Sequence, residues 1–275
     1  MDNKVENSLS NKADSKAHKT PTLKSVEKAF DLLGCFSHDT PDYSMLEIAE
    51  KLSMSKGSVH RILLTAQKKG FIEKNHSTKR YQLGIKLFEL GSVVMLRTNL
   101  SQESLPILRN VTYETGETSY LNIKESDEAL CIQRVEGHNY LRVLFLEMGK
   151  KMPLYIGAGP KILLAYMNDK DIEEWFMRNH DLVKWTEHTV TDKELIWQDI
   201  RKIRERGFAE SLEDVTSGVT SVGAPIKNSE GKVIAAVSIG GASMNFSDDK
   251  RKHFIKIVKD AGLQISKRMG YITGY

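Results

Sequence analysis

Residues 44–83 carry the pattern that most narrows the possible folds of this chain. Ser44 precedes an apolar-periodic segment and Glu47 follows three positions later, which is the signature of a capping box at a helix start. A second amphipathic segment, 56–69, follows after a short connection, and Gly70 ends it. Two short β-type runs around a polar turn come directly afterwards. Two closely spaced helices followed by a hairpin predict a winged helix-turn-helix.

The two faces of the predicted 56–69 helix differ in polarity. One face is cationic, and the other carries the apolar residues Val59, Ile62, Leu63 and Ala66. Between residues 51 and 86 nine lysines and arginines stand against the single acid Glu73, whereas the net charge of the whole chain is only +4. A basic segment concentrated within a folded pattern indicates a polyanionic partner. The alternative interpretation is a helix whose basic face is simply solvated.

The residue types on the cationic face suit contact with duplex DNA. In a helix-turn-helix the second helix enters the major groove with its N-terminal residues against the base edges. Here those residues are Lys56, Gly57, Ser58, His60 and Arg61. An arginine pairs with guanine through two hydrogen bonds, and a lysine neutralises a phosphate. The hairpin adds three candidates for phosphate or minor-groove contact, namely His76, Lys79 and Arg80.

The segment before this motif is expected to contain a polar tail and one further helix. Residues 1–21 lack periodicity and lack the apolar stretch of a secretory signal, which predicts a disordered tail. Ser25 is the expected N-cap of the helix that follows. The face of that helix expected to point inward carries Val26, Phe30, Leu33 and Phe36.

Several global features favour a cytoplasmic protein. Neither half of the chain has an apolar stretch of roughly 18 residues, so no transmembrane helix and no membrane partner are expected. Cys35 and Cys131 lie far apart in apolar surroundings, which predicts two reduced thiols in the core.

Beyond Gly116 the pattern changes to β-rich runs mixed with amphipathic helices. The expected strands are 118–123, 129–135, 141–145, 208–212, 222–226 and 233–240, and the expected helices are 160–167, 169–178, 192–206 and 248–269. This order predicts an α+β domain with an antiparallel sheet against flanking helices. The expected organisation is a 1–21 tail, a 22–83 winged helix-turn-helix domain, an 84–98 linker helix and a 99–273 effector domain.

Two stretches of sequence, one in each predicted domain, resemble a known family. The N-terminal stretch contains TLKSVEKAFDLLGCF and MLEIAEKLSMSKGSVHRILLTAQKKGFIEKNHSTKRYQLG. The C-terminal stretch contains GKKMPLYIGAGPKILLAYM and RERGFAESLEDVTSGVTSVGAPIKNSEGKVIAAVSIGG. Together, over roughly residues 22 to 272, they resemble the IclR family of bacterial transcription regulators. The resemblance implies a GAF-like domain that binds a small metabolite, often a carboxylate or an aromatic acid, and dimers or dimers of dimers on palindromic operators.

The resemblance also implies which residues line the effector cavity. They are Ala158, Gly159, Ser211, Val219, Ser221, Ser238 and Gly240. The residues themselves are compatible with this, because the small residues before the 160–167 helix leave backbone N–H groups at its positive end, where a carboxylate binds well. The alternative is a plain tight turn. Tyr155 and Pro160 stand where many family members carry His and Gly, and Ser211 stands where some carry Asp, which leaves the identity of the ligand open.

Two functional hypotheses follow from the sequence. The first is a ligand-responsive DNA-binding regulator, expected to repress a catabolic operon in response to a small organic acid. The alternative is an enzyme or a small-molecule-binding module whose N-terminal helices serve only dimerisation. Because the sequence has no nucleophile motif, Walker A motif or dinucleotide fingerprint, we predict no enzymatic activity, no cofactor and no metal site. The operator, the choice between repression and activation, and the choice between dimer and tetramer stay open.

Overall fold

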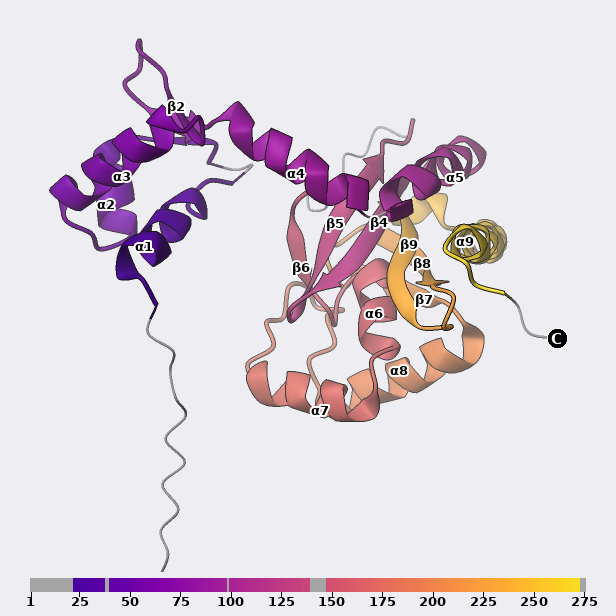
Figure 1. The fold of residues 1–275 in the computed structure, drawn as a ribbon. Helices are drawn as coiled ribbons and strands as arrows, with labels where there is room; N and C mark the ends of the chain where they lie inside the picture. The colour runs from indigo at the N-terminus through magenta and orange to yellow at the C-terminus, as the bar shows by residue number, and fades with distance from the viewer. Residues whose placement is uncertain (1–21, 38–39, 98, 139–146, 273–275) are drawn as a thin grey trace, which may run out of the picture. The chain divides into compact units, whose positions relative to one another are not determined.

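The computed structural model describes residues 22–37, 40–97, 99–138 and 147–272. The chain divides into two compact units with the boundary between Val94 and Met95 (Figure 1). The predicted tail 1–21 and the predicted strand 141–145 both lie outside the described residues. Within the described part, no helix is both long enough and apolar enough to cross a membrane.

The first unit contains three helices and a small sheet, followed by a fourth helix that runs across the unit boundary. In chain order the elements are α1 (Lys24–Leu33), β1 (Asp42–Tyr43), α2 (Met45–Lys51), α3 (Lys56–Lys68), β2 (Ile72–Lys74), β3 (Tyr81–Leu83) and α4 (Ile85–Arg97). The two hairpin strands were predicted, but β1 was not. It pairs antiparallel with β3, so the sheet order is β1-β3-β2.

Local signals in the sequence explain how α2 and α3 begin. The capping box predicted for α2 is present, because the Ser44 hydroxyl accepts from the Glu47 amide and the Glu47 carboxylate accepts from the Ser44 amide. Ser55 caps α3 in the same way by accepting from the Ser58 amide. Each cap satisfies an amide at a helix start that has no partner within the helix.

The first helix differs from its prediction. It begins at Lys24, with Leu23 and not Ser25 at the N-cap. Half of the expected inward face is also wrong, because Val26 and Phe30 are exposed whereas Leu32 is buried. The other two residues of that face, Leu33 and Phe36, pack against the core as predicted. The helix carries apolar side chains on more than one side, and its side toward the core is the one with Leu32.

The second unit is an α+β domain, as predicted, built on a six-stranded sheet. In chain order its elements are α5 (Asn99–Thr115), β4 (Thr118–Glu125), β5 (Glu128–Val135), β6 (Lys151–Pro153), α6 (Ala158–Ala165), α7 (Asp169–Arg178), α8 (Lys193–Arg206), β7 (Ala209–Leu212), β8 (Val219–Lys227), β9 (Val233–Ala242), the 3-10 helix η1 (Ser243–Asn245) and α9 (Asp248–Arg268). The strand order is β6-β5-β4-β9-β8-β7, and every neighbouring pair is antiparallel.

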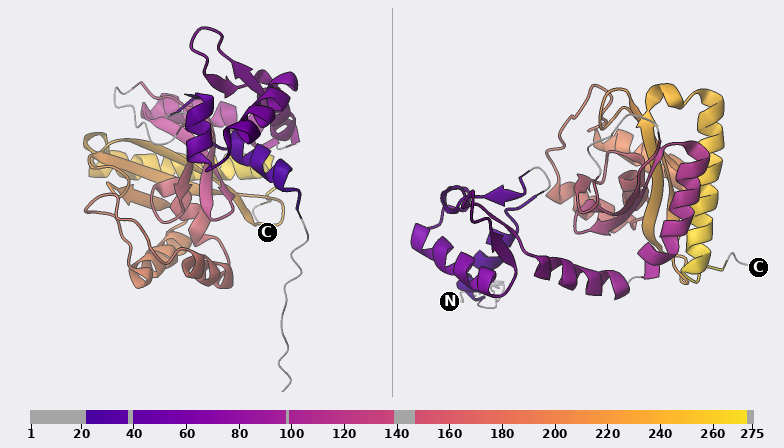
Figure 2. Two further views of the ribbon diagram at one scale, coloured as in Figure 1. Left: turned by 90° about the vertical axis from the view of Figure 1, so that its left-hand side faces the viewer. Right: turned by 90° about the horizontal axis from the view of Figure 1, so that it is seen from above.

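Helices cover both faces of this sheet, and the two faces differ in polarity. On one face α5 and α9 lie side by side over a core that includes Leu121, Val237 and Phe254 (Figure 2). On the other face lies α6, which packs with α7 and α8 in a second core around Ile162 and Trp175. The sheet residues beneath α6 include many polar side chains, and this face holds the candidate effector site.

Both cysteines are free, buried thiols, as predicted, and Cys35 lies in the core of the first unit. Burial raises the pKa of Cys131 to about 12, so this thiol is protonated at neutral pH.

Candidate DNA-reading helix and effector site

The N-terminal turns of α3 present the predicted cationic face to solvent. Lys56, His60 and Arg61 are exposed, while Val59 and Leu63 are completely buried on the opposite side. Neither Lys56 nor Arg61 forms an ion pair with any residue that the structure describes. Their charges are therefore available to an external anion.

The other two predicted residues of α3, Gly57 and Ser58, lie in its first turn. Gly57 is exposed, and a Cβ atom there would meet nothing within 4 Å, so this position is open to the close approach of another molecule. Ser58 is half-buried, and its hydroxyl lies 3.0 Å from the Ser55 hydroxyl. Ser58 therefore belongs partly to the cap.

The wing is the hairpin formed by β2 and β3, and it has an exposed tip and an anchored base. His76 and Lys79 are exposed at the tip, where the side chain of Asn75 accepts hydrogen bonds from the next turn residues. Arg80 lies at the base. Its guanidinium contacts the Asp42 carboxylate at 2.6 Å and the Glu47 carboxylate at 3.0 Å. Arg80 therefore connects β3 to β1 and to the cap of α2, and within this structure it acts as an internal connection.

The carboxylate of Glu47 is held in its charged form by the same contacts. The Ser44 backbone N–H, above all, and the Arg80 guanidinium hold the pKa of Glu47 below its usual range. The start of α2 and the base of the wing are thus parts of one hydrogen-bonded cluster.

In the second unit the start of α6 is held by two side chains of the sheet and its loop. The Ala158 amide donates to the Ser221 hydroxyl at 3.1 Å, and the Gly157 amide donates to the Asp214 carboxylate at 3.1 Å. Both amides were candidates for binding a ligand carboxylate from the sequence. In the structure they are occupied by the chain itself, so the positive end of α6 is already partly neutralised.

The strands bring most of the predicted effector residues close to this helix start. Ser221 on β8 lies opposite Gly240 on β9, and Ser238 lies one pair further along the same face. A Cβ atom added at Gly159 would lie 3.1 Å from the Ser238 hydroxyl, which shows how closely α6 approaches the sheet. Ala158, Gly159, Ser221, Ser238 and Gly240 therefore form one cluster.

The other two predicted residues lie at the edge of this cluster. Ser211 on β7 is opposite Ser221, and its hydroxyl donates to the Asp214 carboxylate. Val219 lies opposite Ala242 near the start of β8 and is half-buried.

Comparisons with known proteins agree in both units. The family description "IclR helix-turn-helix domain" matches residues 25–76, and "Bacterial transcriptional regulator IclR C-terminal" matches residues 93–267. The HTH-type transcriptional regulator KipR of Bacillus subtilis is 31% identical over 248 residues, which cover 90% of this chain and 98% of KipR. The chain belongs to the IclR family of bacterial transcriptional regulators.

Solved structures share the fold of this IclR-family chain. The crystal structure of Thermotoga maritima IclR has a TM-score of 0.72 and 32% identity, covering 90% of this chain and 99% of that one. An IclR homologue from Microbacterium hydrocarbonoxydans, crystallised with 4-hydroxybenzoate, has a TM-score of 0.80 and 22% identity, covering 89% of this chain and 98% of that one. This IclR-family protein is thus a transcriptional regulator with a DNA-binding helix-turn-helix domain and an effector-binding domain.

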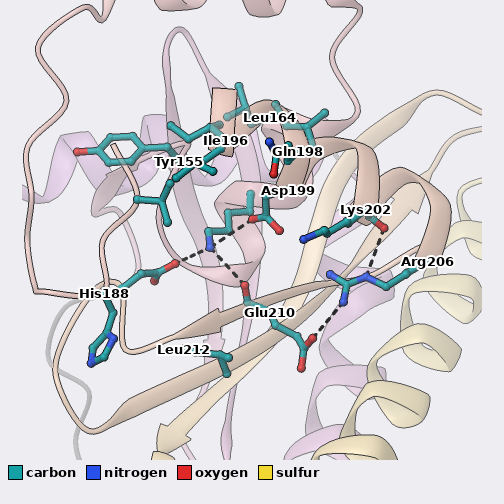
Figure 3. A pocket seen from close by; sticks show the side chains of 15 residues that line it. Tyr155, Leu164, His188, Ile196, Gln198, Asp199, Lys202, Arg206, Glu210 and Leu212 are labelled. Carbon is teal, nitrogen blue, oxygen red and sulfur yellow. Dashed lines mark hydrogen bonds and ion pairs between the residues drawn. The ribbon is translucent and has the colours of Figure 1, made fainter. Parts of the chain in front are cut away.

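A buried ion pair next to the predicted effector residues was missed by sequence reasoning. The Lys161 ammonium lies 2.6 Å from the Asp214 carboxylate, 3.5 Å from that of Asp199, and donates to the Glu210 carbonyl at 3.3 Å. Asp214 is almost fully buried. These residues line a cleft of about 360 Å³ between α6, α8 and β7 (Figure 3). Asp214 stands in a polar loop sequence that gives no sign of burial.

Sequence reasoning also missed three polar residues on the sheet face that α6 covers. Tyr120 on β4 lies opposite Ser238 on β9 and opposite Arg134 on β5, and directly opposed residues of an antiparallel pair share a face. Asn122 is two residues further along β4, on the same face. Only the strand register reveals that these side chains join the cluster around Ser238.

Proposed function

We propose that this IclR-family regulator represses a catabolic operon in the cytoplasm and releases its operator when a small organic acid binds in the second unit. The outward face of α3, with Lys56 and Arg61 exposed and unpaired among the described residues, carries the DNA-binding part of the proposal. Lys56, Gly57, Ser58, His60 and Arg61 are the proposed major-groove residues. His76 and Lys79 at the wing tip are the proposed backbone contacts, and Arg80 is proposed only to support the wing.

A gel-shift series against salt with fragments from the gene's own neighbourhood tests the DNA-binding part. Affinity is expected to fall steeply with salt, because each neutralised phosphate releases counterions. Arg61→Ala should weaken binding to the operator by about 1–3 kcal/mol and leave binding to unrelated DNA almost unchanged, as for a lost pair of bonds to a base. Arg109→Ala, an exposed arginine on α5, is the matched control.

Two results would contradict this assignment. If Arg61→Ala discriminates operator from unrelated DNA as well as the parent protein does, α3 does not read the sequence through Arg61. If no fragment binds even at low salt, the proposal that this chain regulates transcription by binding DNA is contradicted.

The effector part of the proposal places the acid against the cluster of Ala158, Gly159, Ser221, Ser238 and Gly240, with Ser211 and Val219 at its edge. The 4-hydroxybenzoate complex of the Microbacterium homologue supports an acid as the ligand class for this fold. The acid would act by preferring one of two arrangements of the DNA-binding domains, transmitted through α4, because a ligand shifts an equilibrium only through differential affinity. Release of labelled operator on addition of the acid measures this coupling.

We also propose that the active species is a homodimer or a dimer of dimers. Helices α1 and α4 each carry more than one large apolar side chain in solvent, with Phe30 on α1 67% exposed and Phe88 on α4 72% exposed. Exposed apolar surface of this kind is typical of protein interfaces. Sedimentation velocity of Phe30→Glu and Phe88→Glu is expected to show smaller species, whereas Met177→Glu on α7, 72% exposed, should sediment like the parent. Unchanged sedimentation of both phenylalanine variants would exclude these helices as the interface.

A further inference from the structure

The polar face beneath α6 contains buried groups that lack partners within the described protein. The side chain of Asn122 is completely buried, and neither its amide nitrogen nor its oxygen has a hydrogen-bond partner among the described residues. The Tyr120 hydroxyl and the Arg134 Nε atom are buried and unpartnered in the same sense, whereas the Arg134 Nη2 atom lies 3.5 Å from the Glu136 carboxylate. All three side chains share one sheet face through the pairing of β4 with β5.

Such groups are rare in folded proteins because burying a polar atom without a partner costs free energy. Three of them on one face, beside the proposed effector cluster, indicate that a bound molecule completes their hydrogen bonds. The nearest backbone supports this, because a Cβ atom at Gly159 would lie only 2.5 Å from the Asn122 amide nitrogen. Gly159 therefore allows the amide of Asn122 to lie at the start of α6, where the predicted ligand site is.

The chemistry of the three groups specifies what would satisfy them. The Asn122 amide both donates and accepts, and a hydroxyl group is the small partner that does both in return. Arg134 only donates, and burial raises the pKa of Tyr120 to about 12, so its hydroxyl keeps a proton to donate at neutral pH. Two donors on one face suit a carboxylate, and the charge of Arg134 strengthens that bond.

The first turn of α6 offers a carboxylate few free backbone donors. The amides of Gly157 and Ala158 are bonded to Asp214 and Ser221, and Pro160 has no N–H group. An acidic ligand in this cluster therefore gains more from orienting its carboxylate toward Arg134 and Tyr120.

We infer that the effector is a hydroxy acid, with its carboxylate on Arg134 and Tyr120 and a hydroxyl group on Asn122. This inference rests on the proposed effector function and assigns residues of β4 and β5 to the same site. Arg134 supplies affinity for acids in general, and Asn122 selects those that carry a hydroxyl.

Matched pairs of acids test the inference by titration calorimetry on the full-length protein. The probes are glycerate against propionate, gluconate against hexanoate, and 4-hydroxybenzoate against benzoate. For at least one pair, the hydroxy acid is expected to bind roughly 10-fold to 100-fold more tightly, because its analogue leaves the Asn122 amide unpartnered. Asn122→Ala should reduce this preference to about one, whereas Asn110→Ala, which removes an exposed amide on α5, should preserve it.

A second variant keeps the inference testable if Asn122→Ala fails to fold. Arg134→Gln is expected to weaken both members of a pair by a similar factor and to leave the preference for the hydroxyl intact. A merely structural role for Asn122 would instead weaken both acids equally in Asn122→Ala, and that result overturns the inference.

The remaining outcomes separate this inference from the proposed function. If acids bind but hydroxyl and deoxy partners bind equally to the parent protein, the effector proposal stands and the hydroxy-acid inference is overturned. If no acid of the three pairs binds, the inference is overturned together with the effector part of the proposed function. The gel-shift test of α3 is independent of both results.

Discussion

The two proposed functional surfaces of this protein share one property and differ in another. On α3 the cations Lys56 and Arg61 point to solvent, and on the sheet face under α6 the polar groups of Tyr120, Asn122 and Arg134 point inward. Lys56 and Arg61 form no ion pair among the described residues, and the Tyr120 hydroxyl, the Asn122 amide and the Arg134 Nε atom have no hydrogen-bond partner there. An exposed cation without a partner costs the protein little free energy because water solvates it. A buried amide without a partner costs more because it has lost its contacts with water. The first surface is therefore compatible with a stable empty domain, and the second reduces stability until its ligand binds.

The largest expected effect concerns the ion pair beside the effector cluster. Asp214→Asn leaves the Lys161 charge without its closest partner and weakens the acceptor of the Gly157 amide. We expect unfolding free energy to fall by about 3 kcal/mol, as for one broken half of a buried pair. Urea denaturation measures the loss, with the exposed Asp181→Asn as control.

The double variant Asp214→Asn with Lys161→Met distinguishes a paired role from a general packing role. If the buried charge of Lys161 causes the loss, removing it should recover part of the stability. Equal losses from the single and double variants would show that the ion pair is not what Asp214 contributes.

The next effect sharpens the comparison at the contact between α6 and the sheet. Gly159→Ala places a methyl group 2.5 Å from the Asn122 amide, so one of the two must move. We expect a stability loss of about 1–3 kcal/mol, as for overpacking of a core, together with loss of the response to acids. Operator binding without effector should stay close to that of the parent. A variant that still responds normally to acids would contradict the proposed position of the ligand.

A smaller effect contrasts two arginines of the DNA-binding unit. Arg80→Ala removes the partly exposed contacts with Asp42 and Glu47, and it should lower the unfolding free energy slightly. Arg61→Ala should leave stability unchanged and reduce operator affinity. Thermal unfolding and gel shifts on both variants give the comparison. The opposite pattern, with Arg61 needed for stability and Arg80 for sequence discrimination, would exchange the roles we assign.

The smallest expected effect is a pH dependence at the start of α2. Hydrogen bonds hold the pKa of Glu47 below its ordinary value of 4.5, so its ionised form is favoured in the folded protein. The stabilisation is complete above that ordinary value and is lost as the pH falls through the lower folded value. Glu47→Gln keeps the capping geometry and should flatten this part of the acid unfolding profile. The exposed Glu50→Gln on the same helix should not, and equal profiles for both variants would contradict the assignment.

How far the sequence predicted each surface depends on how local the signals are. The sequence predicted where α2 and α3 begin and where α3 ends, because the residues that cap each helix lie directly beside its first or last turn. Half of the inward face predicted for the first helix was wrong, because Val26 and Phe30 are as apolar as a core side chain but lie in solvent, whereas Leu33 and Phe36 do pack against the core. Local periodicity does not say which of two apolar sides meets the rest of the domain.

The effector face depended on information that the sequence does not contain locally. Residues from Thr118 to Asn122 are buried without alternation, so the pattern does not show which of them belong to which face. Tyr120, Ser238 and Arg134 become neighbours only through the register of three strands, of which β9 is far from β4 and β5 in the chain. Family resemblance supplied Ser221 and Ser238, but it did not supply Asn122.

The anchoring of Arg80 has a consequence for the DNA sites this protein selects. Because its guanidinium connects the wing to the start of α2, and α2 packs against α3, the wing and the helix keep a fixed separation. The distance along the duplex between the positions contacted by the wing and by α3 is then constant. For the proposed dimer on a palindromic operator, the spacing of contacted positions within one half-site should be invariant, and tolerated length changes should fall between the two halves.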